Sequence, residues 1–266
     1  MKLGFLGPKG TFSFEVAENY AGKSELVEFA TITEIITSLK NDEIAEAIVP
    51  IENSIQGGVT ETMDALIETD GIFVKEERIA KIKHHLMANR KYEWKEIKEV
   101  YSHPQALAQC RTYLEKNLKN ARINQVSSTA LAAKEISQKD FCACIANIAC
   151  VEEYGLTLLA SDIQENEWNQ TKFWLMSKTQ NEEGNQMSLL FSTKHKPGAL
   201  YRVLRIFNEN QVNLTKIESR PAKTELGDYI FLVDLEINDA IDSVIELLKA
   251  ECKSVKILGR YEGGKL

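Results

Sequence analysis

Cysteine, histidine and proline are scarce in this sequence, and their scarcity argues against several kinds of site. The 266 residues include 5 cysteines, 5 prolines and 4 histidines. His84 and His85 are adjacent, so along a strand they would point to opposite faces. Cys142 and Cys144 lack the two-residue spacer of a redox or zinc pair. We therefore expect reduced thiols, no metal site and no cofactor.

Positive charge and long apolar stretches are also lacking. Lysine and arginine total 32 against 39 acidic residues, which gives a formal net charge of −7. A nucleic-acid partner requires a basic face, so this charge argues against one. No apolar stretch approaches the roughly 18–20 residues of a membrane helix, and the one at the N-terminus is too short for a signal peptide. We expect a cytoplasmic protein without a membrane partner.

Strand and helix patterns divide the chain into two predicted domains. Short apolar strands alternate with amphipathic helices over residues 1–178, which predicts an α/β domain. The polar tract KTQNEEGNQ (178–186) then indicates a linker. Residues 187–266 show the order strand, helix, strand, strand, helix, strand, which predicts a small ferredoxin-like domain.

Two turns that follow predicted strands carry polar residues. GPKGTFS (7–13) joins a strand to a helix capped by Thr11 or Ser13, so its N–H groups and the helix dipole could hold a carboxylate. Its glycines and lysine do not have the spacing of a nucleotide-binding loop. PIENSIQGGV (50–59) places an acid, the amide of Asn53 and a hydroxyl after a buried strand, where open α/β sheets bind ligands. Each stretch is equally consistent with a turn stabilised by local hydrogen bonds.

A third polar stretch is SHPQALAQC (102–110), where Pro104 is expected to open a helix. Ser102, Gln105 and Gln109 share one predicted face, apart from the apolar face of that helix. This stripe could bind a polar ligand through uncharged hydrogen bonds, or it could be a solvated helix face. His103 could be a general base or a capping residue.

NQTKFWLMS (169–177) places Thr171 and Lys172 where a polar segment enters an apolar strand. The two residues are either the polar edge of a buried strand or part of a reactive site.

Taken in order, GPKGTFS, PIENSIQGGV, YSHPQALAQC, SSTALAA (127–133) and NQTKF resemble the catalytic domain of the prephenate dehydratase family. KPGALYRVLRIFNENQVNLTKIESRP resembles the ACT regulatory domain that accompanies it. The family converts prephenate to phenylpyruvate, water and CO₂ in phenylalanine biosynthesis. The resemblance implies two α/β subdomains with a cleft between them, similar to type II periplasmic binding proteins. The chain would cross between the subdomains near residues 75–82 and 160–168.

The resemblance also implies site residues for a small dicarboxylate substrate. Catalytic residues would be Thr171, Asn53, Ser102 and Gln109, and substrate contacts would come from Glu52, Thr11, Ser13, Lys172 and Phe173. Thr171 would assist the departing C4 hydroxyl by donating a hydrogen bond or relaying a proton. The reaction forms an aromatic ring, so its driving force is large and no electron-sink cofactor is required.

In the C-terminal domain, the resemblance implies a phenylalanine site at the interface of a homo-oligomer, either a dimer or a tetramer. Its residues would be Gly198, Ala199, Leu200, Asn213, Glu218 and Ser219. Phenylalanine bound there would favour a less active arrangement of the cleft.

The sequence departs from the family at Lys172, where the motif usually has arginine. If arginine holds a carboxylate bidentately, lysine offers only one point contact. Strand alternation puts Thr171 and Lys172 on opposite faces, so the ammonium group could instead hold a neighbouring loop. We favour a substrate role slightly. Two other functions stay open, namely the same scaffold acting on arogenate and a non-catalytic amino-acid sensor.

Overall fold

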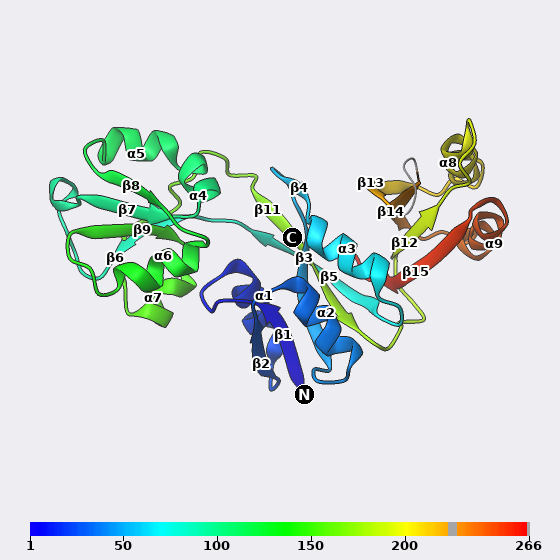
Figure 1. Ribbon diagram of the computed structural model, residues 1–266, viewed down its shortest axis with the longest axis horizontal. Helices are drawn as coiled ribbons and strands as arrows, with labels where there is room; N and C mark the ends of the chain where they lie inside the picture. Colours follow the sequence, from blue (N-terminus) through cyan, green and yellow to red (C-terminus); the bar gives the residue numbers. More distant parts are fainter. Residues whose placement is uncertain (223–227, 265–266) are drawn as a thin grey trace.

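The computed structural model describes residues 1–222 and 228–264. Two α/β lobes lie side by side, and a C-terminal domain packs on the first lobe, on the side away from the second (Figure 1).

The first lobe is built on a six-stranded sheet with the order β2-β1-β3-β11-β5, to which β4 adds by pairing with β3. β1 is parallel to β2 and β3, whereas β11 is antiparallel to both β3 and β5. The strands are β1 (Lys2–Leu6), β2 (Glu25–Phe29), β3 (Glu46–Asn53), β4 (Gly57–Gly58), β5 (Phe73–Lys81) and β11 (Gln170–Ser177). The helices are α1 (Phe12–Ala21), α2 (Ile32–Lys40) and α3 (Thr60–Glu68).

The second lobe has a five-stranded sheet with the order β10-β6-β9-β7-β8. Its strands are β6 (His85–Ala88), β7 (Glu99–Ser102), β8 (Arg122–Gln125), β9 (Cys142–Ala146) and β10 (Thr157–Ala160). Its helices are the short η1 (Trp94–Glu96), α4 (Pro104–Gln109), α5 (Arg111–Asn117), α6 (Thr129–Ile136) and α7 (Ala149–Tyr154).

Two short segments connect the lobes. The chain leaves the first sheet at the end of β5 and enters the second at His85, so the first crossing is the segment 82–84. It returns between the end of β10 and the start of β11, through the segment 161–169. The range 75–82 expected for the first crossing therefore lies mostly on β5, whose residues pair with β11 along its length.

Two helices that begin at the boundary between the lobes, α1 and α6, each have a hydroxyl side chain that caps their first turn. Thr11 Oγ1 accepts the N–H of Phe14 at the start of α1, and Ser128 Oγ accepts the N–H of Leu131 at the start of α6. Such caps satisfy N–H groups that have no partner within the helix.

The polar stripe predicted for residues 102–110 needs a correction. α4 begins at Pro104 with His103 as its cap, so Ser102 is the last residue of β7 and does not share a helix face with Gln105 and Gln109. Pro104 suits the first helical position, but it disfavours helical backbone at the residues before it.

The C-terminal domain has the predicted order βαββαβ. Its elements are β12 (Gln186–Ser192), α8 (Ala199–Glu209), β13 (Leu214–Pro221), β14 (Tyr229–Glu236), α9 (Ile241–Glu251) and β15 (Ser254–Tyr261), and the sheet order is β13-β14-β12-β15. The ferredoxin-like prediction is confirmed.

The two faces of this sheet contact different neighbours. One face packs on α8 and α9, where Phe191 and Val233 join a buried cluster with Phe207. The alternate residues face the first lobe, and Leu190 and Leu232 belong to the same buried cluster as Trp174 of β11. Strand alternation thus supplies an apolar contact on each side of the sheet.

Candidate active site

A cleft of about 380 Å³ lies between the lobes and is lined by residues of both. The starts of α1 and α6 line it, and the N–H groups and dipoles of helix N-termini favour negatively charged groups. Within residues 1–222 and 228–264, the lining contains no lysine, arginine, aspartate or glutamate. The cleft is therefore suited to an anion, and its side chains are mostly neutral.

Thr171 and Asn53 lie opposite each other in β11 and β3, and both line the cleft. Asn53 Nδ2 donates to Thr171 Oγ1 at 2.9 Å. Thr171 is only 9% exposed, and its oxygen accepts this hydrogen bond. The threonine O–H can then be donated to a group bound in the cleft.

Backbone N–H groups fix the direction of this hydrogen bond. Ile55 and Gln56 donate their N–H groups to Asn53 Oδ1 at 3.0 and 3.1 Å, so the other amide atom, Nδ2, must be the donor toward Thr171. Asn53 Nδ2 also donates to Asn169 Oδ1 at 2.9 Å. The orientation of the Asn53 amide is therefore set by the fold.

The same logic extends into the second lobe. Because Asn169 Oδ1 accepts from Asn53, Asn169 Nδ2 is the donor to Gln109 Oε1 at 2.8 Å. Gln109 Oε1 also lies 2.9 Å from His84 Nε2, which must then carry its proton. A polar chain thus links His84, Gln109, Asn169, Asn53 and Thr171, with the donor and the acceptor of each hydrogen bond fixed, and it includes a residue from each crossing segment.

Burial keeps the His84 ring neutral. It lowers the pKa of His84 from 6.5 to about 4, although the hydrogen bond with Gln109 acts in the opposite direction. The neutral ring donates from Nε2 and retains a lone pair on Nδ1. Neither His84 Nδ1 nor Gln109 Nε2 has a hydrogen-bond partner in the part of the chain that the structure describes.

Three further predicted residues lie at the cleft. Thr11 Oγ1 donates to the carbonyl of Leu6 at 3.1 Å and caps α1, so its hydroxyl is occupied within the fold. Ser13 lines the cleft from the first turn of α1. Phe173 is 2% exposed and belongs to the apolar cluster beneath this wall.

Ser102 is held elsewhere. Its hydroxyl is completely buried and donates to the carbonyl of Ile145 in β9 at 2.6 Å. Its observed contact is therefore within the core of the second lobe.

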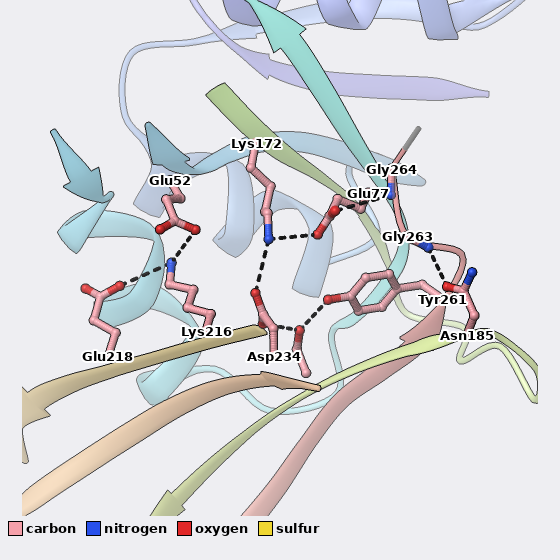
Figure 2. A network of polar contacts seen from close by, with 11 residues as sticks. Glu52, Glu77, Lys172, Asn185, Lys216, Glu218, Asp234, Tyr261, Gly263 and Gly264 are labelled. Atoms are coloured by element: carbon pink, nitrogen blue, oxygen red, sulfur yellow. Dashed lines mark hydrogen bonds and ion pairs between the residues drawn. The ribbon is translucent and has the colours of Figure 1, made fainter. Parts of the chain in front are cut away.

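Glu52 and Lys172, both predicted to contact substrate, face the C-terminal domain instead (Figure 2). Lys172 Nζ lies 3.2 Å from Glu77 Oε2 and 3.4 Å from Asp234 Oδ2. Glu52 Oε2 lies 3.4 Å from Lys216 Nζ of β13. These two substrate contacts are corrected, because successive strand residues point to opposite sides of a sheet, and of the two pairs it is Thr171 and Asn53 that face the cleft.

Burial disfavours the charged form of Lys172, but attraction by Asp234 and Glu77 outweighs this effect. The pKa of Lys172 is therefore raised above its ordinary value, and its ammonium group stays charged.

The residues predicted to bind phenylalanine are distributed over two sides of the C-terminal domain. Gly198, at a φ of 75°, caps α8, followed by Ala199 and Leu200 in its first turn. Asn213 Nδ2 donates to Glu236 at 3.1 Å. Glu218 lies 3.2 Å from Lys216 on the side facing the first lobe, whereas Ser219 is the next residue of β13 and points the other way. The side chains of Glu218 and Ser219 therefore lie on opposite faces of this sheet.

Comparison with known proteins agrees with this architecture. The prephenate dehydratase family model matches residues 3–181, and the ACT domain model matches residues 187–253. The chain belongs to the prephenate dehydratase family. It is 35% identical to the prephenate dehydratase of Lactococcus lactis subsp. cremoris (strain MG1363), over 98% of this chain and 97% of that protein. It is 34% identical to that of Bacillus subtilis (strain 168), with both chains covered completely.

A solved prephenate dehydratase has the same fold. The Arthrobacter aurescens enzyme in complex with L-Phe superposes with a TM-score of 0.91 at 30% identity, over 98% of this chain and 90% of that one.

The motifs of the family pointed to Thr171, Asn53 and Gln109 but not to His84 or Asn169. Asn169 is the first residue of NQTKF, and its position two residues before Thr171 is the only local signal for it. His84 precedes a strand without any recognisable motif, so only the crossing of the chain brings it beside Gln109.

Within the described residues, no three His, Cys, Asp or Glu side chains gather in a way that could hold a metal ion. No helix among them is both long and apolar enough to cross a membrane.

Proposed function

We infer that this chain is a prephenate dehydratase, which removes CO₂ and the C4 hydroxyl from prephenate to give phenylpyruvate. The observation that carries this assignment is the hydrogen bond from Asn53 to Thr171. It orients the threonine hydroxyl as a donor in a cleft whose lining side chains are mostly neutral.

The cleft suits the two carboxylates of prephenate. Thr11–Ser13 at the start of α1 and Ser127–Thr129 at the start of α6 lie on its opposite lobes. Each helix start can hold one carboxylate through N–H groups, without a cation. Binding the dianion between two such sites would fix the ring with its C4 hydroxyl toward the strand that carries Thr171.

The reaction needs help for a poor leaving group. As the ring carboxylate departs as CO₂, its bonding electron pair forms the aromatic ring and expels the C4 oxygen. Thr171 donates a hydrogen bond to that oxygen, and one proton from solvent, passed on through the threonine hydroxyl, converts the departing hydroxide to water and leaves Thr171 unchanged. Asn53 steadies the Thr171 oxygen during this step. Apolar groups such as Phe173 and Val59 keep water from the reacting carboxylate. A carboxylate with less hydration is less stable, which favours its departure as neutral CO₂.

The test is formation of phenylpyruvate from prephenate at neutral pH, compared with prephenate alone under the same conditions. Thr171→Val keeps the shape but removes the hydroxyl, and we expect kcat to fall by about 10²–10⁴-fold. Thr171→Ser keeps the hydroxyl, and we expect it to retain most of the activity.

The wild-type chain should form product well above the background rate, and its absence would refute the enzyme assignment. Equal activity of Thr171→Val and wild type would refute the role of Thr171 alone. Arogenate assayed in parallel determines which of the two substrates is preferred.

We also propose that phenylalanine is the effector and that it binds to the ACT domain of a cytoplasmic homo-oligomer. The match of residues 187–253 and the complex of the Arthrobacter relative with L-Phe support this proposal. Gly198, Ala199, Leu200, Asn213 and Ser219 remain its candidate contacts, and Glu218 would act from the domain interface.

A further inference from the structure

The strands that carry Thr171 and Asn53 have a second, opposite face. In the pairing of β3 with β11, Asn53 is opposite Thr171 and Glu52 is opposite Lys172. The first pair faces the cleft, and the second pair faces the ACT domain. The two catalytic side chains are thus one residue away from two side chains held by another domain.

The carboxylate that pairs with Lys172 is almost completely buried. Asp234 is 1% exposed, and its two carboxylate oxygens have different partners. Ser188 Oγ donates to Oδ1 at 2.5 Å, and the Tyr261 hydroxyl lies 2.5 Å from the same serine oxygen, so it donates in turn to Ser188. Oδ2 faces Lys172 Nζ at 3.4 Å (Figure 2). The carboxylate position is therefore fixed from inside the ACT domain.

The second contact repeats this arrangement with the charges reversed. Lys216 of β13 is 7% exposed and lies between Glu52 at 3.4 Å and Glu218 at 3.2 Å. Separating Lys172 from Asp234 would leave the buried Asp234 carboxylate without a cationic partner, which is strongly unfavourable. Separating Glu52 from Lys216 would leave the buried Lys216 with Glu218 alone. The ACT domain cannot shift on the first lobe without disturbing β3 and β11 at these residues.

We propose that Lys172 and Glu52 are positioning residues, through which the ACT domain fixes the geometry of Thr171 and Asn53 on the other face of the sheet. This inference rests on the proposed function. It gives the lysine of the Thr-Lys-Phe sequence a role apart from substrate binding. A change in the position of the ACT domain would move Lys172, and Lys172 is bonded directly to Thr171 in the same strand.

Another interdomain contact provides a matched control. Lys256 of β15 donates to the carbonyls of Leu66 and Thr69 at 2.8 and 2.6 Å, and it pairs with Asp70 at 2.7 Å. This lysine also joins the ACT domain to the first lobe, but it binds the end of α3, which carries no polar residue of the cleft. Lys256→Met therefore weakens docking without acting on β3 or β11.

The experiment compares kcat and KM for prephenate in Lys172→Met, Asp234→Asn, the double variant and Lys256→Met. We expect both single variants to lower kcat roughly tenfold or more while KM changes much less, because small displacements of catalytic groups are costly. The double variant should lose no more than the worse single variant, because both changes break the same link. Lys172→Arg should restore kcat, and Lys256→Met should leave it unchanged.

Several results would overturn the inference. A raised KM with unchanged kcat in Lys172→Met would indicate a substrate contact. Multiplicative losses in the double variant, or an equal loss in Lys256→Met, would indicate general damage to the fold. If Lys172→Met does not fold, Asp234→Asn decides, because it keeps the side-chain shape, and normal kcat there refutes the proposal. An inactive wild-type chain would refute the proposed function, whereas an active wild type with fully active variants would refute only this inference.

Discussion

The buried imidazole of His84 gives a prediction about pH that can be tested without substrate. Burial lowers its pKa from 6.5 to about 4, and Gln109 Oε1 accepts its Nε2–H at 2.9 Å. Between these two pH values the unfolded chain binds a proton at this histidine that the folded chain does not. His84 therefore contributes stability that is fully present above about pH 6.5 and is lost as the pH falls toward 4.

The size of this effect follows from the shift. At about 1.36 kcal/mol per pKa unit, a lowering from 6.5 to about 4 corresponds to about 3 kcal/mol of unfolding free energy. Such a loss is a large fraction of the stability of an ordinary domain. Carboxylates add their own pH dependence, but they do so equally in wild type and in a histidine variant.

Two measurements check this prediction. The chain has 4 histidines, so a two-dimensional NMR titration of the ring carbons resolves each of them, with single variants giving the assignments. We expect the His84 signal to titrate near pH 4. In His84→Gln, the loss of stability between pH 7 and pH 4.5 should be smaller than in wild type by a substantial part of that 3 kcal/mol. The exposed His195 provides the control, and His195→Gln should follow the wild-type curve.

A His84 ring that titrated at 6.5 or above would refute the reasoning. The ring would then be partly cationic at neutral pH, and the neutral tautomer that completes the polar chain to Thr171 would not be fixed. The same conclusion would follow if His84→Gln and wild type lost stability in parallel as the pH falls.

Two more predictions concern the polar chain and the thiols. Asn169→Ala should lower kcat by roughly tenfold or more and cost about 1–3 kcal/mol of stability, because it removes a buried amide that joins Asn53 to Gln109. Steady-state kinetics and thermal melts measure the two quantities. Ser54→Ala removes an exposed contact to the same crossing segment and should change neither of them much. All 5 cysteines are buried, and burial raises the pKa of Cys110 and Cys150 to about 12. A thiol-reactive dye at pH 8 should therefore label the native chain slowly and should label all five thiols after denaturation. Fast labelling of the native chain would contradict the buried arrangement.

The elements that local patterns define were predictable from the sequence. α1 begins at Phe12, directly after Thr11, one of the two caps predicted from GPKGTFS. Gly155 ends α7 with a φ of 63°, the left-handed conformation that glycine adopts easily. The βαββαβ order after residue 187 was also readable, because each element has its own apolar period. Ser102 was misjudged, because the helix starts after it and its hydroxyl finds a carbonyl in β9.

The identity of the catalytic candidates was available from the sequence, but their contacts were not. Thr171 and Asn53 are 118 positions apart, and only the antiparallel pairing of β11 with β3 places the amide of one 2.9 Å from the hydroxyl of the other. His84 likewise has no local signal, since its neutral state depends on burial between elements from distant parts of the chain.

Lys172 shows most clearly which properties follow from the sequence and which follow only from the tertiary structure. Strand alternation, a property of the sequence once the strand is known, already placed its side chain opposite Thr171. The sequence could not say what lies on that side, because Asp234 is 62 residues away and belongs to another domain. Local periodicity therefore determined which way the lysine points, and only the packing of the ACT sheet on the first lobe determined that it binds a buried carboxylate there.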